Sequence, residues 1–456
     1  MPTGFDEEKI RSALLSRRSI LVGSAAAAGT FLLAACTSPG TTASSTGAAS
    51  GAPADLAISW WGSDDRHQKT LAMLKLYSQK HPEVTFEPTY GGLIGYQDKM
   101  VTQFSGGNGP DVIQLADRLP FIANKQLLGL DKYVKDDSLD LSKTDKTTID
   151  AQRVEGKLYT LPWGLAAGVM FYDTKVFSEA GVKDAEMAWT WDTYRGVCET
   201  IVKATPDGFY GSADIWAPAG TGAWAPFVSL LLSRELRPYN EEGKLDFKKE
   251  QLKEWFSFWD DMRKDGLVTP PDITALEAGY ETSPIVMGKA AIYPINSSIA
   301  SSLQALAKNP LGITTLPTGA KSTKYLKADK FGQYINASII LGANAKSKSS
   351  QAVIDFMNFM INDPDANKIT LMSRGVPMSS EIVKLVTPLV SPVEKSMIDA
   401  IAYIQKNAVP DVLAPPVADG QISSLFGRSH QSIAFGQASV DDTVDSFFTE
   451  ATRLLS

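Results

Sequence analysis

Tryptophan side chains outside the regular apolar stretches have the clearest chemical use in this sequence. Trp61 ends an apolar stretch, residues 55–62, that is typical of a short strand. Successive strand residues face opposite sides, so only one of Trp60 and Trp61 need face a ligand, and we favour Trp61. Trp216 and Trp224 flank a Gly- and Pro-rich segment, where large rings are unusual unless something covers them. Sugar rings pack their C–H faces on aromatic planes, so these side chains are candidate saccharide platforms, with core packing as the alternative.

Motifs of common enzyme and metal sites do not occur in the sequence. The three histidines, His67, His81 and His430, are scattered, and no Cys/His group has metal-ligand spacing. The sequence contains no G-x-G-x-x-G, no G-x-x-x-x-G-K-[ST] and no G-x-S-x-G. A glycoside hydrolase would need two carboxylates about 5–10 Å apart, which a sequence does not show. We therefore expect no cofactor, no metal and no catalytic residue, and keep a hydrolase as the less favoured alternative.

Composition places the chain among ordinary globular proteins of two-domain size. It has 456 residues, of which 44% are apolar and 21% are charged, and its formal net charge is −7. An acidic balance speaks against nucleic acid as a partner. Cys36 and Cys198 are the only cysteines, and Cys198 lies in an apolar-patterned stretch that predicts burial.

The N-terminal residues have the layout of an export signal. Arg17-Arg18 precedes the apolar run 20–35, which is too short for a confident membrane span and ends in small residues and Cys36. The paired arginines resemble a twin-arginine signal, and Leu33-Ala34-Ala35-Cys36 resembles a bacterial lipobox, whose cysteine is lipidated. Residues 36–54 form a linker rich in Ser, Thr, Gly and Ala. We expect residues 1–35 to be removed and an exported protein anchored through Cys36 to the outer face of the cytoplasmic membrane.

Strand-length apolar stretches alternate with helical periodicity in the first part of the mature chain. Residues 55–62, 84–88 and 110–115 are predicted strands, and residues 66–80 and 96–104 are predicted helices. This alternation indicates β-α-β units, a parallel-type sheet and the α/β class.

Two later segments are predicted helices from their apolar periodicity. Residues 249–263 carry one apolar stripe that includes Trp255 and Trp259, so both rings are expected in the core rather than at a ligand. Residues 352–361 form the second apolar helix, which Asn362-Asp363-Pro364 should end.

A series of short motifs resembles the extracellular solute-binding proteins of carbohydrate import systems, the maltose-binding protein group. Each motif is weak alone, but their order matches that of the family from about residue 55 to the C-terminus. The matching segments are 109–118, 126–131, 154–162, 170–181, 190–194, 287–292, 315–319, 362–366 and 435–442.

This resemblance implies a periplasmic-binding-protein type II fold, in which two α/β lobes joined by hinge crossovers enclose a central ligand cleft. We place the first lobe at residues 55–165 with 310–345, and the second at 166–309 with 346–456. By the same resemblance, the protein is a monomeric receptor for a sugar or oligosaccharide. It would deliver this ligand by hinge closure to the permease of an ABC transporter.

The resemblance also suggests which side chains contact the sugar. Asp117-Arg118 matches the Asp-Arg pair of the maltose-binding proteins, and Asp64 and Asp65 lie where the family places polar contacts. Trp163 directly follows the implied crossover. Carboxylates accept from hydroxyl groups and a guanidinium donates in a fixed plane, which suits a saccharide. Weaker candidates on the second lobe and near the hinge are Asn296, Ser298 and Arg374.

The sequence departs from the maltose-binding pattern at three positions. Ala166 stands where that protein has a sugar-contacting glutamate, and Ser298 and Ser423 stand where it has tryptophans. These differences put maltose itself in doubt. The same fold with a glycerophosphodiester or peptide ligand remains an alternative, since a phosphate would favour basic residues and helix N-termini.

Overall fold

The computed structural model describes residues 53–93, 95–183, 185–216, 223–317, 324–328, 330–335, 339–408 and 415–456. The predicted export signal, the lipidation site Cys36 and nearly all of the linker lie outside these residues. The described residues belong to one compact unit. Within them, no helix combines the length and the apolar character that crossing a membrane requires.

A five-stranded mixed sheet forms the centre of the first lobe, with strand order β2-β1-β3-β11-β6. β1 pairs in parallel with β2 and β3, whereas β11 pairs antiparallel with β3 and β6. All four residues of β3 and of β11 are buried, as expected for strands covered on both faces. The strands are β1 (Ala54–Trp61), β2 (Val84–Gly91), β3 (Val112–Leu115), β6 (Thr160–Pro162) and β11 (Ile340–Ala343), with a separate pair β4 (Arg153–Val154) and β5 (Lys157–Leu158).

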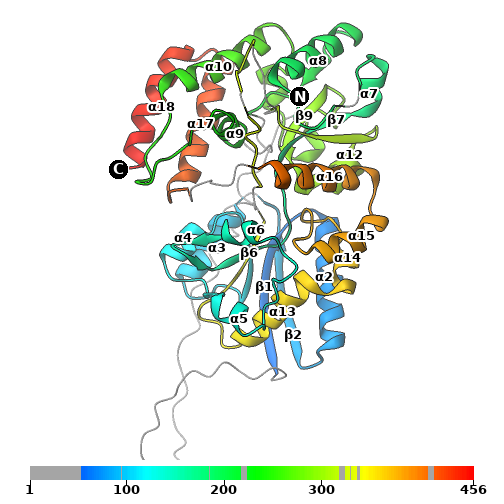
Figure 1. The fold of residues 1–456 in the computed structure, drawn as a ribbon, viewed down its shortest axis with the longest axis vertical. Coiled ribbons are helices and arrows are strands. Elements are labelled where there is room, and N and C mark those ends of the chain that lie inside the picture. The colour runs from blue at the N-terminus through cyan, green and yellow to red at the C-terminus, as the bar shows by residue number, and fades with distance from the viewer. Residues whose placement is uncertain are drawn as a thin grey trace, which may run out of the picture. The chain divides into compact units, whose positions relative to one another are not determined.

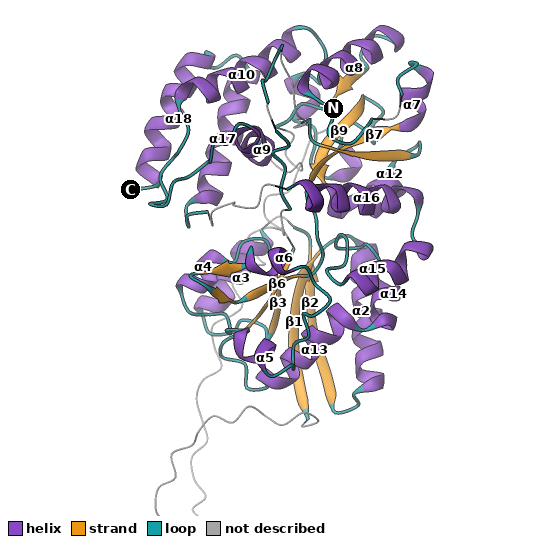
Figure 2. Cartoon of the chain, in the orientation of Figure 1, coloured by secondary structure: helices purple, strands orange, loops and turns teal. Residues whose placement is uncertain are grey.

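Helices surround this sheet in the lower part of Figures 1 and 2. The longest, α2, begins where the Ser63 side chain accepts a hydrogen bond from the Arg66 amide, and it ends just before Pro82. The helices of the first lobe are α2 (Asp64–Lys80), α3 (Tyr96–Ser105), α4 (Leu119–Ala123), α5 (Asp131–Lys135), α6 (Lys146–Asp150), α13 (Ser350–Asn362), α14 (Pro364–Thr370) and α15 (Ser380–Val386).

A four-stranded mixed sheet forms the centre of the second lobe, with strand order β10-β7-β9-β8. β7 pairs antiparallel with β9 and β10, and β8 pairs in parallel with β9. Its strands are β7 (Gly168–Asp173), β8 (Tyr210–Ser212), β9 (Ala290–Asn296) and β10 (Leu311–Thr315).

The remaining helices belong to the second lobe, in the upper part of Figure 1. α10 packs Trp255 and Trp259 into an aromatic core with Trp191, and both rings are fully buried, which confirms their predicted role. Cys198 is also buried, as predicted. These helices are α7 (Thr174–Glu179), α8 (Trp191–Ala204), α9 (Trp224–Ser233), α10 (Lys249–Lys264), α11 (Pro271–Thr274), α12 (Ala300–Leu306), α16 (Pro392–Asn407), α17 (Asp419–Ala434) and α18 (Val440–Leu454).

The chain passes between the lobes three times, and the structure divides it differently from the expected boundaries. The segments that pass, here called crossovers, lie between β6 and β7, between β10 and β11, and between α15 and α16. β10 belongs to the second sheet because it pairs with β7, although residues 310–345 were expected in the first lobe. α13 packs on β11, and α14 on α2, so the first lobe extends beyond residue 345. Strand pairing between distant segments sets these boundaries.

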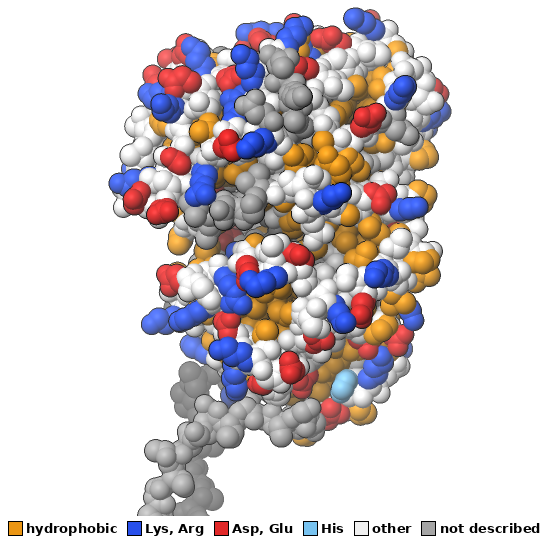
Figure 3. Space-filling view, in the orientation of Figure 1, with side chains coloured by type: hydrophobic (Ala, Val, Ile, Leu, Met, Phe, Trp, Pro, Cys, Tyr) orange, Lys and Arg blue, Asp and Glu red, His pale blue; other side chains and the backbone are white. Residues whose placement is uncertain are grey.

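Charged side chains of both signs are mixed on the face shown in Figure 3. Lysine and arginine alternate with aspartate and glutamate over both lobes, so this face carries no broad field of one sign. The electrostatic character of a ligand site must therefore come from local groups.

Candidate functional site

The order of strands in the first sheet identifies where a ligand would approach. β1 lies between β2 and β3 in the sheet. After β1, the chain forms β2 on one side of it and then returns past β1 to form β3 on the other side, which makes a topological switch point. In open α/β sheets, ligands bind outside the carboxyl ends of the strands at such a switch point. β6 runs in the same direction as β3, because both pair antiparallel with β11, and it leads into the first crossover. The carboxyl ends of β1 and β3 therefore face the crossovers.

In the second sheet, the carboxyl ends of β8 and β9 also face the crossovers. β8 and β9 are parallel, and Asn296 at the end of β9 pairs with Gly168, the first residue of β7 after the crossover. The predicted residues Asn296 and Ser298 therefore lie beside the crossover. The Asn296 side chain accepts a hydrogen bond from the Ser298 amide, and the Ser298 carbonyl accepts from Arg66 of the first lobe at 3.3 Å.

Asp117 and Arg118 lie in the loop that follows β3, at the switch point. The Leu119 amide donates to Asp117 Oδ1 at 2.9 Å, and Gln97 donates to the Asp117 carbonyl. Burial raises the pKa of the Asp117 carboxyl, opposed by the Leu119 hydrogen bond and the Arg118 charge. Arg118 Nη2 donates to the Ala151 carbonyl at 3.4 Å, while its buried Nε has no partner among the described residues. Both side chains thus retain hydrogen-bonding capacity.

Asp419 contributes a second carboxylate from the other lobe. It is the first residue of α17, and its Oδ1 accepts hydrogen bonds from Trp224 Nε1 at 3.1 Å and Tyr239 Oη at 2.7 Å. Burial raises the pKa of Asp419, the two hydrogen bonds oppose this shift, and the charge of Asp117 adds to it. The charge of Asp117 in the first lobe therefore acts on Asp419 in the second.

Trp61, Asp64 and Asp65 follow one another at the carboxyl end of β1. The Trp61 ring is buried against Tyr96, with ring centroids 5.1 Å apart. Asp64 and Asp65 occupy the first turn of α2 and are exposed, and Asp65 pairs with Lys69 at 2.9 Å. Carboxylates at this position also complement the helix dipole, which gives them a structural use besides any ligand contact.

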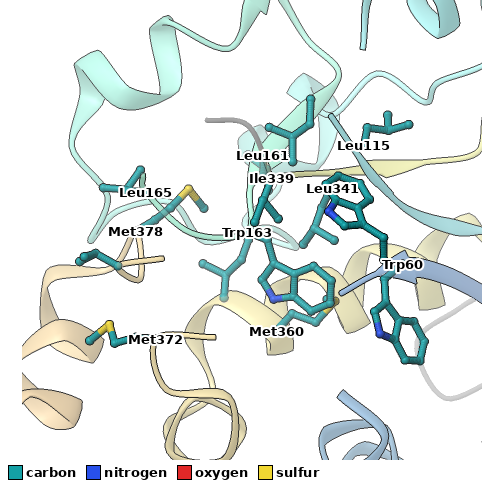
Figure 4. Packing of buried hydrophobic residues seen from close by; sticks show 14 of the residues in the cluster. Trp60, Leu115, Leu161, Trp163, Leu165, Ile339, Leu341, Met360, Met372 and Met378 are labelled. Carbon is teal, nitrogen blue, oxygen red and sulfur yellow. The ribbon is translucent and has the colours of Figure 1, made fainter. Parts of the chain in front are cut away.

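Trp163 and Arg374 form a packed joint between two chain segments at the crossovers. The Arg374 guanidinium lies 3.5 Å from the centroid of the Trp163 ring. Its Nε donates to Gln114 Oε1 at 3.1 Å and its Nη2 to Thr70 Oγ1 at 2.7 Å. Figure 4 shows Trp163 among apolar side chains that include Ile339 and Met360. Burial, and then the charge of Arg66, hold the pKa of Arg374 well below its ordinary value.

The two candidates from the Gly- and Pro-rich segment lie apart. Trp224 starts α9 and contacts Asp419 at the N-terminus of α17, whereas Trp216 contacts Phe435 just beyond its C-terminus. A helix of 16 residues rises about 24 Å, so these contacts stand at opposite ends of α17. The structure thus places Trp224 at the Asp419 end of α17 and Trp216 at the opposite end. Both rings are buried.

Sequence reasoning missed Asp419 and its partner Tyr239. Asp419 lies some 300 residues beyond Asp117, and a single aspartate at the start of a helix is an ordinary feature. Nothing in the local sequence signals its contact with Trp224. Among the described residues, no three His, Cys, Asp or Glu side chains group closely enough to hold a metal ion.

Comparisons with known proteins agree with this architecture. Residues 72–390 match the family described as bacterial extracellular solute-binding protein. A binding protein of Brucella abortus (strain 2308) is 22% identical over 363 residues, covering 78% of this chain and 82% of that protein. A lactose-binding protein of Rhizobium radiobacter is 27% identical over 128 residues, covering 26% and 29%. A periplasmic oligogalacturonide binding protein from Yersinia enterocolitica, in complex with saturated digalacturonic acid, has a TM-score of 0.75 at 23% identity, covering 88% of this chain and 98% of that chain. This last likeness shows that the two-lobe fold is shared.

Proposed function

Because the chain belongs to the bacterial extracellular solute-binding proteins, we propose that it captures a sugar or oligosaccharide and delivers it to the permease of an ABC transporter. The saccharide is supported by similarity to a lactose-binding protein and by a shared fold with an oligogalacturonide binding protein. The side chains at the switch point suit the same ligand class, since carboxylates and a guanidinium pair with hydroxyl groups.

The observation that carries the proposal is that each of the two lobes supplies polar groups to the candidate site. Asp117 and Arg118 follow β3 of the first sheet, whereas Asp419 and Trp224 belong to helices of the second lobe. A ligand that contacts both groups stabilises one relative arrangement of the lobes over others. Closure of this kind couples capture to a surface that a permease can recognise, and a ligand shifts the equilibrium by its differential affinity for the two arrangements.

A ligand screen tests the proposal. The purified full-length protein is heated with mono- and oligosaccharides, with glycerophosphodiesters and peptides as the comparison set. A ligand present at 100 times its Kd adds about 2.7 kcal/mol to the free energy of unfolding, which gives a clear rise in Tm. We expect a rise with a saccharide and recovery of that saccharide unchanged. A phosphodiester or peptide that alone raises Tm would keep the fold and overturn the sugar.

One observation on the carboxylates Asp117 and Asp419 supports the alternative of a hydrolase. Burial raises the pKa of both Asp117 and Asp419, and perturbed carboxylates are typical of glycoside hydrolases. We favour binding without turnover, because Asp419 Oδ1 is already held by two donors and both carboxylates suit sugar hydroxyls. Release of shorter sugars over hours of incubation, lost in Asp117→Asn, would establish the hydrolase instead.

Anchoring through Cys36 completes the proposal. The residues that support it are the paired arginines, the apolar run and the lipobox-like segment that ends at Cys36. In the expressing cell we expect the protein in the membrane fraction, with a lipid mass on the N-terminal peptide. Cys36→Ala should release it from the membrane fraction without changing sugar affinity. Membrane retention of that variant would contradict lipidation at this residue.

A further inference from the structure

Residues of the second lobe fix the position of the Asp419 side chain, but among the described residues they pair only one of its two carboxylate oxygens. Trp224 and Tyr239 both donate to Oδ1, and no described residue donates a hydrogen bond to Oδ2. The side chain is half-buried, so the remaining oxygen is partly desolvated, and no lysine or arginine among the described residues forms an ion pair with it. A carboxylate accepts several hydrogen bonds, and a partly desolvated one gains from each that it makes.

The charges around Asp419 define what kind of group can approach it. The charge of Asp117 acts on Asp419 from the first lobe, and the charge of Asp419 contributes to the raised pKa of Tyr334. Arg118 is the basic side chain beside Asp117, and it already donates to the Ala151 carbonyl. Asp117, Asp419 and Arg118 together carry two negative charges and one positive charge, so these described groups give a net negative charge. A neutral hydroxyl placed between the carboxylates relieves their repulsion by donating to them, whereas a third carboxylate adds to it.

We propose that Asp419 is a ligand-contacting, specificity-determining residue that accepts a hydroxyl from the bound saccharide and excludes a sugar carboxylate from that position. This inference rests on the proposed function, since it names the class of saccharide that the same site takes. The ligand is a neutral sugar, or one with an amino group at this position, and uronic acids are rejected. Selection by repulsion of the wrong ligand is a common source of specificity.

The test compares two matched ligands on the full-length wild type and on variants of it. A neutral saccharide that raises Tm is paired with its uronic acid counterpart, and both are titrated calorimetrically at neutral pH. The variant is Asp419→Asn, which removes the charge and keeps the size. The matched control is Asp441→Asn, which makes the same change in net charge at an exposed residue of α18 that pairs with Lys253.

We expect the wild type and Asp441→Asn to prefer the neutral sugar by at least about tenfold, as a like-charge contact costs more than that. Asp419→Asn should bind the neutral sugar more weakly and bring the preference to within about threefold. Equal affinity of the wild type for both sugars overturns the inference by itself, even if the variant does not fold. An unchanged preference in a folded Asp419→Asn overturns it as well.

The outcomes separate this inference from the proposed function. If no saccharide binds the wild type, both the proposed function and the assignment of Asp419 are wrong. If a saccharide binds but the uronate binds equally, or the preference survives in Asp419→Asn, only the assignment of Asp419 falls. Asp419→Glu keeps the charge and should therefore retain the preference for the neutral sugar, and a loss of preference in this variant would contradict the inference.

Discussion

Two regions at the crossovers differ in how their polar groups are satisfied. In the joint formed by Trp163 and Arg374, the guanidinium is buried, stacks on the ring and donates to Gln114 and Thr70, and of its nitrogens only Nη1 has no partner among the described residues. At the switch point, Arg118 and Asp419 keep atoms that no described residue pairs. Both regions contain residues that chemistry alone would assign to a ligand. The difference lies in the number of protein partners, because Arg374 has two side-chain acceptors and a ring, whereas Arg118 has one backbone carbonyl at 3.4 Å. It indicates that the joint maintains the fold, while the switch point remains available to a solute.

The largest loss of stability is expected when a side chain is added to the backbone beside Arg374, in the joint. Gly375 has φ +104°, and a Cβ there would overlap the Leu165 carbonyl oxygen. We expect Gly375→Ala to lower the free energy of unfolding by about 3 kcal/mol or more, because strain and overlap add. Chemical denaturation measures this. Gly427→Ala on α17 is the matched control: its Cβ would meet no atom within 4 Å, so stability should hold or rise. A tolerated Gly375→Ala would show that the joint is loosely packed.

Removal of the Arg374 side chain should separate stability from binding. Arg374→Met loses two buried hydrogen bonds and the stacking on Trp163, and leaves Gln114 and Thr70 without their donor. We expect a loss of about 2–4 kcal/mol in the free energy of unfolding. Ligand affinity of the folded fraction should change by less than about threefold, as measured by calorimetry. A large loss of affinity with unchanged stability would move Arg374 from the joint to the ligand site.

The reverse result is expected at the switch point. Asp117→Asn keeps the shape of the side chain and removes a half-buried charge, so stability should change by less than about 1 kcal/mol. Sugar affinity should fall about tenfold, because a charge-assisted hydrogen bond to a hydroxyl becomes a neutral one. Asp261→Asn, at an exposed position on α10, serves as the control and should leave both quantities unchanged. If Asp117→Asn binds as well as the wild type, this side chain does not contact the ligand.

A pH-dependent effect on stability is expected from His430, a buried histidine of α17 in the core of the second lobe. His430 accepts from Trp255 Nε1 at 2.8 Å, and burial, with a smaller contribution from Arg263, holds its pKa well below the ordinary value of 6.5. The unfolded chain therefore binds a proton that the folded protein does not. Stability is fully present above about pH 6.5 and is lost as the pH falls below it, by at most about 1.4 kcal/mol per pH unit. His430→Gln keeps an acceptor and should flatten this part of the profile relative to the wild type. An identical slope in both would exclude His430 as its source.

The sequence predicted most of the fold because local patterns and tertiary packing agree. The predicted helix 249–263 is α10, and the predicted strands at 55–62 and 110–115 are β1 and β3. The resemblance to the extracellular solute-binding proteins is confirmed by the family match over residues 72–390. The lobe boundaries were harder, because the pairing of β10 with β7 joins segments about 140 residues apart.

The candidate site was only partly accessible from the sequence. Trp224 was expected in a loop because glycine and proline precede it, yet it starts α9, every residue of which other than Ala225 is buried. Arg374 has the chemistry of a ligand contact but lies in the joint, which depends on distant Gln114 and Thr70. Asp419 has no distinguishing local pattern, and only the packing of α17 against Trp224 and Tyr239 places it. Side chains that come together from distant segments are the part that local sequence does not encode.

Calorimetric titration of one saccharide into wild type, Asp117→Asn and Asp419→Asn tests the central claim most directly. If groups from both lobes hold a sugar, the wild type binds one molecule, and each variant binds about tenfold or more weakly while keeping its Tm within a few degrees. Binding that is equal in all three proteins would place the ligand elsewhere. No binding of any saccharide by the folded wild type would contradict the proposed function.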